Sequence, residues 1–115
     1  MEFDTFTVTL LESAPGGRSL DAKEAAALQD AHMAFLAALH ESGQLQAAGP
    51  LVDPPGSSFR GLCLHRLSAE EVRALFAKDP LVKAGKLVVR TFTWMVPTGA
   101  ISFSPTRFPH SQAEL

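Results

Sequence analysis

The chain opens with a segment in which apolar and hydroxyl side chains alternate. Phe6, Val8 and Leu10 are separated by threonines within residues 3–11. This two-residue period is typical of a β-strand with one buried face. Proline and glycine follow within residues 13–19, and these turn-forming residues end the predicted strand.

The next pattern predicts a long amphipathic helix. Asp21 and Glu24 have the spacing of a reciprocal N-terminal cap, and Gly43 is the type of residue that ends a helix in a left-handed conformation. Apolar residues recur between them at three- and four-residue spacing. This spacing predicts about twenty helical residues that begin near residue 22.

The rest of the chain predicts a strand, a second strand, a helix and a third strand, over residues 44–53, 59–66, 68–79 and 86–96. The first of these strands contains Gly49 and Pro50, and we place it at a sheet edge because proline cannot donate to an interior ladder. Ser68 and Glu71 form a second capping box, and Asp79 followed by proline ends that helix.

This order of elements predicts an α+β domain. Two helices on one face of an antiparallel sheet give a ferredoxin-like βαββαβ sandwich, which we assign to residues 1–96. The other sheet face is then apolar, and a homodimer packed face to face would cover it. Residues 97–115 form a C-terminal extension, for which an extra strand or arm on a partner and a loose terminus are both open.

Composition and charge limit the expected partners. Hydrophobic residues make up 46% and charged residues 19% of the 115 positions, which is enough apolar material for one folded domain. The formal net charge of −2 gives no cationic field for a phosphate backbone, so we predict no nucleic-acid partner. The acidic start and the lack of a long apolar run predict a cytoplasmic protein without a membrane partner.

The cysteine and histidine content predicts no metal site. Cys63 is the single cysteine, so neither an intrachain disulfide nor a cysteine-rich zinc site can form, and its apolar neighbours favour a position in the core. His40, His65 and His110 match no zinc-ligand spacing. We expect these three histidines at the surface.

His32 is the first candidate for chemistry. On a helical wheel of about 100° per residue, it lies in the middle of the apolar stripe that includes Leu28, Leu36 and Leu39. An imidazole that faces the sheet loses its water, and it needs a hydrogen-bonding partner there.

Asp79 is the partner that the second predicted helix offers. It lies seven residues after Val72 and continues the apolar stripe of that helix. If both helices pack on one sheet face, its carboxylate could accept a hydrogen bond from His32 and raise the basicity of the ring. Two simpler interpretations stay open: a backbone carbonyl satisfies His32, and Asp79 caps the helical turn that follows Pro80.

Gly49 and Pro50 are the candidate substrate-binding residues. The small residues before them, Ala47 and Ala48, leave room over a sheet edge where a ligand could approach the backbone. A bulge that only bends the strand is the alternative.

Several short motifs together resemble the YciI-like, or YCII-related, family. They are AHMAFL, SG, AGPL, DP and AG, at residues 31–36, 42–43, 48–51, 79–80 and 84–85. The resemblance implies a ferredoxin-like fold assembled as a dimeric α+β barrel, with a cleft whose proposed catalytic centre is a histidine and an aspartate. His32 and Asp79 match these two residues, and Gly49 and Pro50 match the segment that borders the cleft.

Two features depart from the family pattern. Asp30 stands where many relatives have a basic residue before the histidine, and this bears on the charge of the substrate. The extension beyond Val96 is longer than the minimal domain, so it could cap the cleft or strengthen the dimer.

The leading hypothesis is a cofactor-independent enzyme of the lyase or isomerase type. His32, oriented by Asp79, would move a proton on a compact aromatic or oxo-acid molecule bound beside Gly49 and Pro50. The alternative is a non-catalytic dimeric module that binds a metabolite, or serves as an accessory, through the same cleft.

Overall fold

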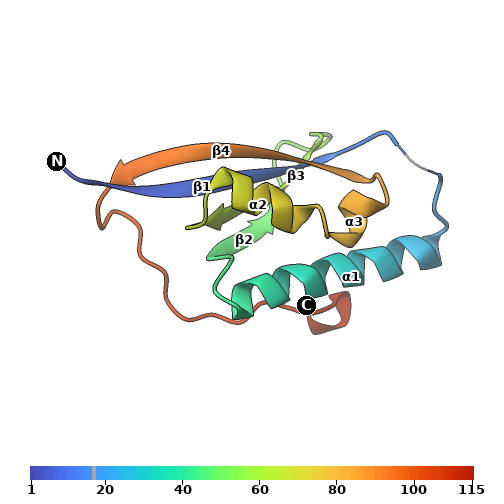
Figure 1. The fold of residues 1–115 in the computed structure, drawn as a ribbon. Helices are drawn as coiled ribbons and strands as arrows, with labels where there is room; N and C mark the ends of the chain where they lie inside the picture. The colour runs from blue at the N-terminus through green and yellow to red at the C-terminus, as the bar shows by residue number, and fades with distance from the viewer. Residues whose placement is uncertain (17) are drawn as a thin grey trace.

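The computed structural model describes residues 1–16 and 18–115, and it contains one four-stranded antiparallel sheet (Figure 1). The strands are β1 (Phe3–Ser13), β2 (Ala47–Pro50), β3 (Phe59–His65) and β4 (Leu87–Pro97). Their order in the sheet is β2-β3-β1-β4, so the predicted α+β, ferredoxin-like class is confirmed. Gly17, which belongs to the predicted turn over residues 13–19, lies outside the described residues.

Three helices pack on one face of this sheet: α1 (Ala22–Glu41), α2 (Ala69–Phe76) and α3 (Pro80–Lys83). Both predicted N-terminal caps are present. The Glu24 amide donates to the Asp21 carboxylate over 2.8 Å, and the Glu71 amide donates to the Ser68 hydroxyl over 3.2 Å. These bonds satisfy backbone donors that have no partner inside the helix. In the part of the chain that the structure describes, no helix combines the length and the apolar character needed to cross a membrane.

Two predicted elements have different bounds. The strand predicted over residues 44–53 is confined to Ala47–Pro50, at the sheet edge as expected. The second predicted helix ends earlier, at Phe76, and a separate short helix, α3, begins at Pro80. Proline at the first helical position suits this start because its fixed backbone angle is already helical.

The helices cover the threonine face of β1. Thr7 and Thr9 are 2% and 0% exposed, and they lie on the same side of the sheet as Leu11, which belongs to the core. Val8 and Leu10 lie on the opposite face and are half-buried. The alternation therefore predicts the strand correctly, but the apolar side of β1 is the side that the helices leave open.

The core is centred on an aromatic side chain of α2. Phe76 is 1% exposed, and its ring meets Phe35 of α1 and His65 of β3 edge to face at centroid distances of 5.7 Å each. Edge-to-face packing adds about 0.5–1.5 kcal/mol per pair to the gain from burial. These contacts join both long helices to the sheet.

The C-terminal extension returns along α1. In Figure 1, residues 98–115 leave the end of β4, pass the C-terminal end of α1 and finish in a short 3-10 helix, η1 (Gln112–Glu114), beside α1. The His40 ring stacks on Phe108 with the centroids 4.0 Å apart. The Asp30 carboxylate accepts the Gln112 amide hydrogen over 2.8 Å. The two features that depart from the family pattern, Asp30 and the extension, thus contact each other.

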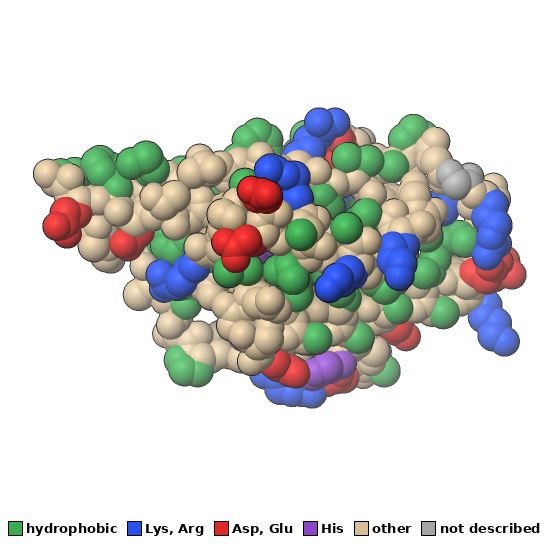
Figure 2. Space-filling view, in the orientation of Figure 1, with side chains coloured by type: hydrophobic (Ala, Val, Ile, Leu, Met, Phe, Trp, Pro, Cys, Tyr) green, Lys and Arg blue, Asp and Glu red, His purple; other side chains and the backbone are tan. Residues whose placement is uncertain are grey.

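Charged side chains are dispersed over the molecular face in Figure 2. Lysines and arginines occur there beside aspartates and glutamates, and they form no single basic patch on this face. The scattered order of these residues in the sequence is therefore matched by a scattered arrangement on this side of the molecule.

Candidate active site

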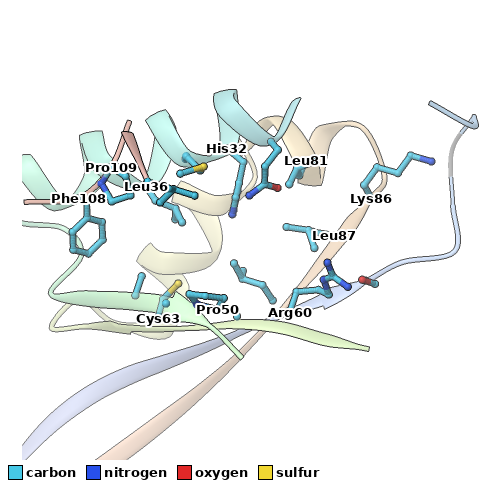
Figure 3. Close-up of a pocket in the computed structure, with 18 of the residues that line it drawn as sticks. His32, Leu36, Pro50, Arg60, Cys63, Leu81, Lys86, Leu87, Phe108 and Pro109 are labelled. Carbon is cyan, nitrogen blue, oxygen red and sulfur yellow. The ribbon is translucent and has the colours of Figure 1, made fainter. Parts of the chain in front are cut away.

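A cavity of about 760 Å³ lies between α1 and the sheet (Figure 3). Four parts of the chain line it: α1, the sheet, the C-terminal extension and the segment of α3 and the following loop that includes Leu81 and Lys86. Among the lining residues are Gln29, His32, Met33 and Leu36 of α1, Ala48, Gly49, Pro50, Arg60 and Gly61 of β2 and β3, and Thr106, Arg107, Phe108 and Pro109 of the extension. Apolar walls with a few polar groups are typical of small-molecule sites.

His32 and Asp79 are in direct contact at the wall of this cavity. The Nδ1 atom of His32 lies 2.7 Å from the Oδ2 atom of Asp79. His32 is 6% exposed and Asp79 is 0% exposed. The pair is therefore shielded from water, and its interaction is stronger than that of an ion pair at the surface.

The second oxygen of Asp79 caps a helix. Oδ1 accepts the Leu81 amide hydrogen over 2.9 Å at the start of α3. The interpretation of Asp79 as a cap and its interpretation as a partner of His32 both describe the structure, because each uses a different carboxylate oxygen. The cap holds the carboxylate in the orientation that the histidine requires.

Asp79 determines which ring nitrogen of His32 carries the proton and which one is left as a base. A carboxylate only accepts hydrogen bonds, so Nδ1 carries the proton that is donated to Oδ2. In the neutral ring, Nε2 then has the free lone pair. A histidine held in this way can take a proton from a bound molecule, and the carboxylate stabilises the imidazolium that forms.

Gly49 and Pro50 line the same cavity as His32. Pro50 pairs with Gly61 of β3 at the sheet edge. A Cβ atom on Gly61 would lie 3.3 Å from the Gly49 carbonyl oxygen, which is tighter than ordinary contact. The small residues keep the sheet side of the cavity open here, and a role of Gly49 and Pro50 in binding stays a prediction.

Cys63 is buried in β3 beneath the cavity. It is 1% exposed, and burial raises the pKa of its thiol to about 12, with a further contribution from the Asp79 carboxylate. The thiol is therefore protonated at neutral pH, and thiols in this form are poor nucleophiles. Cys63 packs as a small apolar side chain, in the core as expected.

The expectation that His65 lies at the surface is wrong. His65 is 0% exposed because its position in β3 faces the helices, opposite Thr7 and against the Phe76 ring. Its Nδ1 atom lies 2.9 Å from the Gln44 carbonyl oxygen. The ring is thus a neutral part of the core. The two-residue period from Cys63 to His65 is the sequence signal that places both on one strand face.

The burial of His65 predicts an acid-sensitive fold. Burial lowers the pKa of its imidazole below the ordinary 6.5, so below that pH the unfolded chain takes up a proton that the folded chain does not. The free energy of unfolding then falls with decreasing pH, by at most about 1.4 kcal/mol per pH unit from this group. Urea unfolding between pH 7 and 5 measures the slope, and we expect a flatter slope in His65→Gln. An equal slope in both proteins would contradict this assignment.

Sequence reasoning missed Arg60 as part of the site, and it left the extension open between a cap of the cleft, an arm on a partner and a loose terminus. Arg60 lines the cavity because the pairing of β3 with β1 is irregular at this point: Leu11 pairs with Gly61, and Glu12 pairs with Phe59. No local motif marks this irregularity. The aromatic and proline residues around Phe108 are a signal of packing, but their partner, α1, is distant in the sequence.

Within residues 1–16 and 18–115, no group of three or more histidine, cysteine, aspartate or glutamate side chains is arranged to hold a metal ion.

The fold and the site define a small ferredoxin-like α+β protein with a histidine and an aspartate paired at a ligand-sized cavity. The YCII-related domain matches residues 6–95, and the chain belongs to the YCII-related family. Among curated proteins, none matches the chain.

The chain is also similar to a solved structure of an enzyme. This is 5-chloro-2-hydroxyhydroquinone dehydrochlorinase (TftG) from Burkholderia phenoliruptrix, in complex with 2,5-dihydroxybenzoquinone. The two chains share 21% sequence identity, with a TM-score of 0.52, over 82% of this chain and 95% of the other. At this level of identity the similarity concerns the fold.

Proposed function

We propose that the cavity is the active site of a small-molecule enzyme, in which His32 transfers a proton during a lyase- or isomerase-type step. The observation that carries this proposal is the 2.7 Å contact between His32 and the fully buried Asp79 at the cavity wall. A general base needs both a fixed orientation and access to the substrate. Gly49 and Pro50 border the substrate on the sheet side, and the mechanism needs no cofactor.

The family and the similar enzyme support small-molecule catalysis. The name of the similar protein describes a dehydrochlorinase, and its structure holds 2,5-dihydroxybenzoquinone, a small single-ring compound. Removal of hydrogen chloride requires that a proton leaves the substrate, which is the step that we assign to His32. The cavity of about 760 Å³ is large enough for a single-ring compound.

We also propose that the protein works as a homodimer through the open sheet face. Val88, Phe92 and Trp94 of β4 are 42%, 50% and 42% exposed on this face. In the register, Val8 of β1 pairs with Phe92, and Leu10 pairs with Arg90 between Val88 and Phe92. Apolar side chains gathered on one face support an interface with a second copy, and this contact would cover the side of the sheet that the helices leave open.

Deuterium exchange in heavy water tests the proposed proton transfer separately from the rest of the reaction. Wild-type protein and His32→Asn are incubated with a panel of compact oxo acids and hydroxylated quinones, and proton NMR follows the loss of each C–H signal. We expect at least one compound to exchange faster with the wild-type protein only. If compounds bind in the cavity and none exchanges in a His32-dependent way, the protein is the non-catalytic metabolite-binding module instead.

A further inference from the structure

We propose that the cavity selects compact organic anions and that Arg60 is the residue that holds the anionic group. This inference shares one assumption with the proposed function, namely that the cavity is the active site. It follows from the position of Arg60, from the charged side chains around the cavity, and from which of these cations already form hydrogen bonds or ion pairs within the protein.

The irregular pairing of β3 turns Arg60 toward the cavity. Gly61 is buried on the helix side of the sheet, opposite Leu11. In a regular strand the preceding residue would point to the other face. Because Leu11 pairs with Gly61 and Glu12 pairs with Phe59, Arg60 is an extra residue in the register. Extra residues of this kind redirect side chains and are frequent beside active sites, and Arg60 indeed lines the cavity.

The described residues that line the cavity include cationic side chains but no aspartate or glutamate; the C-terminal residue, Leu115, also lies in the lining. The cations are Arg60, Lys86 and Arg107. The Asp79 carboxylate lies behind His32, with both oxygens in hydrogen bonds. The side chains at the wall therefore favour an anion over a cation, to the extent that each cation there is free of other partners.

Arg60 differs from the other two cations in its contacts. The Lys86 ammonium donates to the backbone carbonyls of Gly16 and Arg18 over 3.0 and 2.6 Å. Arg107 forms an ion pair with Glu114. Among the ion pairs of the described residues, none includes Arg60.

The carboxylate of Glu12, on the strand next to Arg60, already accepts hydrogen bonds from other side chains. Glu12 accepts hydrogen bonds from Arg90 over 2.7 Å and from Ser58 over 3.0 Å. The guanidinium of Arg60 thus keeps its planar set of donors for a ligand, and this set matches a carboxylate or a paired phenolate in two-point geometry.

Arg60 and His32 approach a ligand from opposite sides. Figure 3 shows His32 descending from α1 and Arg60 rising from the sheet into the same space. An anionic group held by Arg60 would place the ring or carbon skeleton of a compact molecule against His32. When His32 removes a proton, negative charge develops on the substrate, and the guanidinium stabilises that charge.

Matched ligands that differ only in charge test this inference. Benzoate and benzamide are titrated into nitrogen-15-labelled protein, and NMR shifts at cavity residues give both affinities. We expect wild-type protein to bind benzoate more tightly, and Arg60→Gln to weaken benzoate binding about tenfold while benzamide binding stays unchanged. Arg73→Gln is the matched control, since Arg73 lies on α2 and donates to Thr91; it should retain the preference.

The outcomes separate this inference from the proposed function. Equal affinities for the two ligands, no shift at cavity residues with benzoate, or an unchanged preference in Arg60→Gln would each overturn the anion site. His32→Asn should keep the preference for benzoate even though it loses deuterium exchange. Loss of the anion site with His32-dependent exchange intact would leave the proposed function standing.

Discussion

Substitution of His32 by asparagine is expected to reduce proton transfer by a factor of about 10² to 10⁴, the usual contribution of a positioned general base. In the wild-type protein the Asp79 carboxylate accepts from His32 Nδ1 over 2.7 Å. The amide group of an asparagine at this position can still donate to that carboxylate. The buried carboxylate then keeps a donor while the basic Nε2 is lost. The rate of deuterium exchange into the best compound of the panel measures the effect.

A second histidine provides the control for this variant. His110 lies on the extension and contacts Glu41 over 2.6 Å, away from the Asp79 carboxylate. His110→Asn should exchange at the wild-type rate. Thermal unfolding of both variants shows whether the fold persists. If His32→Asn exchanges like wild type, the base is another group; if it fails to fold, His32 is a structural residue.

Asp79→Asn is expected to lose nearly as much activity as His32→Asn while the protein stays folded. The amide oxygen can still cap α3 through the Leu81 amide, which donates over 2.9 Å. The amide nitrogen, however, would donate toward Nδ1 of His32, and the ring must then carry its proton on Nε2. A ring protonated there presents no base to the cavity, and a comparable tautomer change costs about 10⁴ in a serine protease.

Asp79→Ala adds a loss of stability to this loss of activity. It removes the cap of α3 and leaves the Nδ1 donor of His32 buried without a partner. Together these changes should lower the free energy of unfolding by about 2–4 kcal/mol, which urea denaturation measures. Wild-type exchange in Asp79→Asn, or wild-type stability in Asp79→Ala, would contradict the assigned contacts.

Asp21 is the matched control because it is also an N-terminal helix cap. Its carboxylate accepts the Glu24 amide hydrogen over 2.8 Å at the start of α1, and among the described residues it forms no ion pair with a histidine. Asp21→Ala should lower the free energy of unfolding by about 1 kcal/mol and leave exchange unchanged. The comparison separates loss of a cap from loss of the partner of His32.

The sequence predicted the helices and strands well because their caps and hydrophobic periods are set by neighbouring residues. The capping boxes at Asp21 and Ser68 lie where α1 and α2 begin. The inward position of His32 follows from helical period alone, since three- and four-residue spacing defines one side of a helix. The position of Pro50 at a sheet edge follows from its missing amide hydrogen. Each of these inferences needs only a few neighbouring residues.

The features that sequence reasoning missed depend on contacts between distant segments. Arg60 faces the cavity because the register between β1 and β3 is irregular, and register is a property of two strands. His65 is buried because Phe76, from another element, covers it. The apolar side of β1 looked like the buried side, but the helices cover the side with Thr7 and Thr9, which are 2% and 0% exposed.

The extension illustrates the same limit. The sequence left a loose terminus, an arm on a partner and a cap of the cleft open, and residues 106–109 line the cavity beside α1. The contacts that hold them include the stacking of Phe108 on His40, the 3.1 Å contact of His40 Nε2 with the Thr106 carbonyl oxygen, and the hydrogen bonds of Gln112 to Asp30. The spacing of residues along a short segment cannot predict such contacts between distant segments.

The protonation state of the His32 ring at neutral pH decides whether this side chain can act as the base. Long-range proton–nitrogen NMR of histidine side chains distinguishes a protonated ring nitrogen from one with a free lone pair. We expect His32 to carry its proton on Nδ1, beside Asp79, and its Nε2 to be unprotonated and to shift when a ligand enters the cavity. A proton fixed on Nε2, or an Nε2 signal that ignores every ligand bound in the cavity, would rule out His32 as the base.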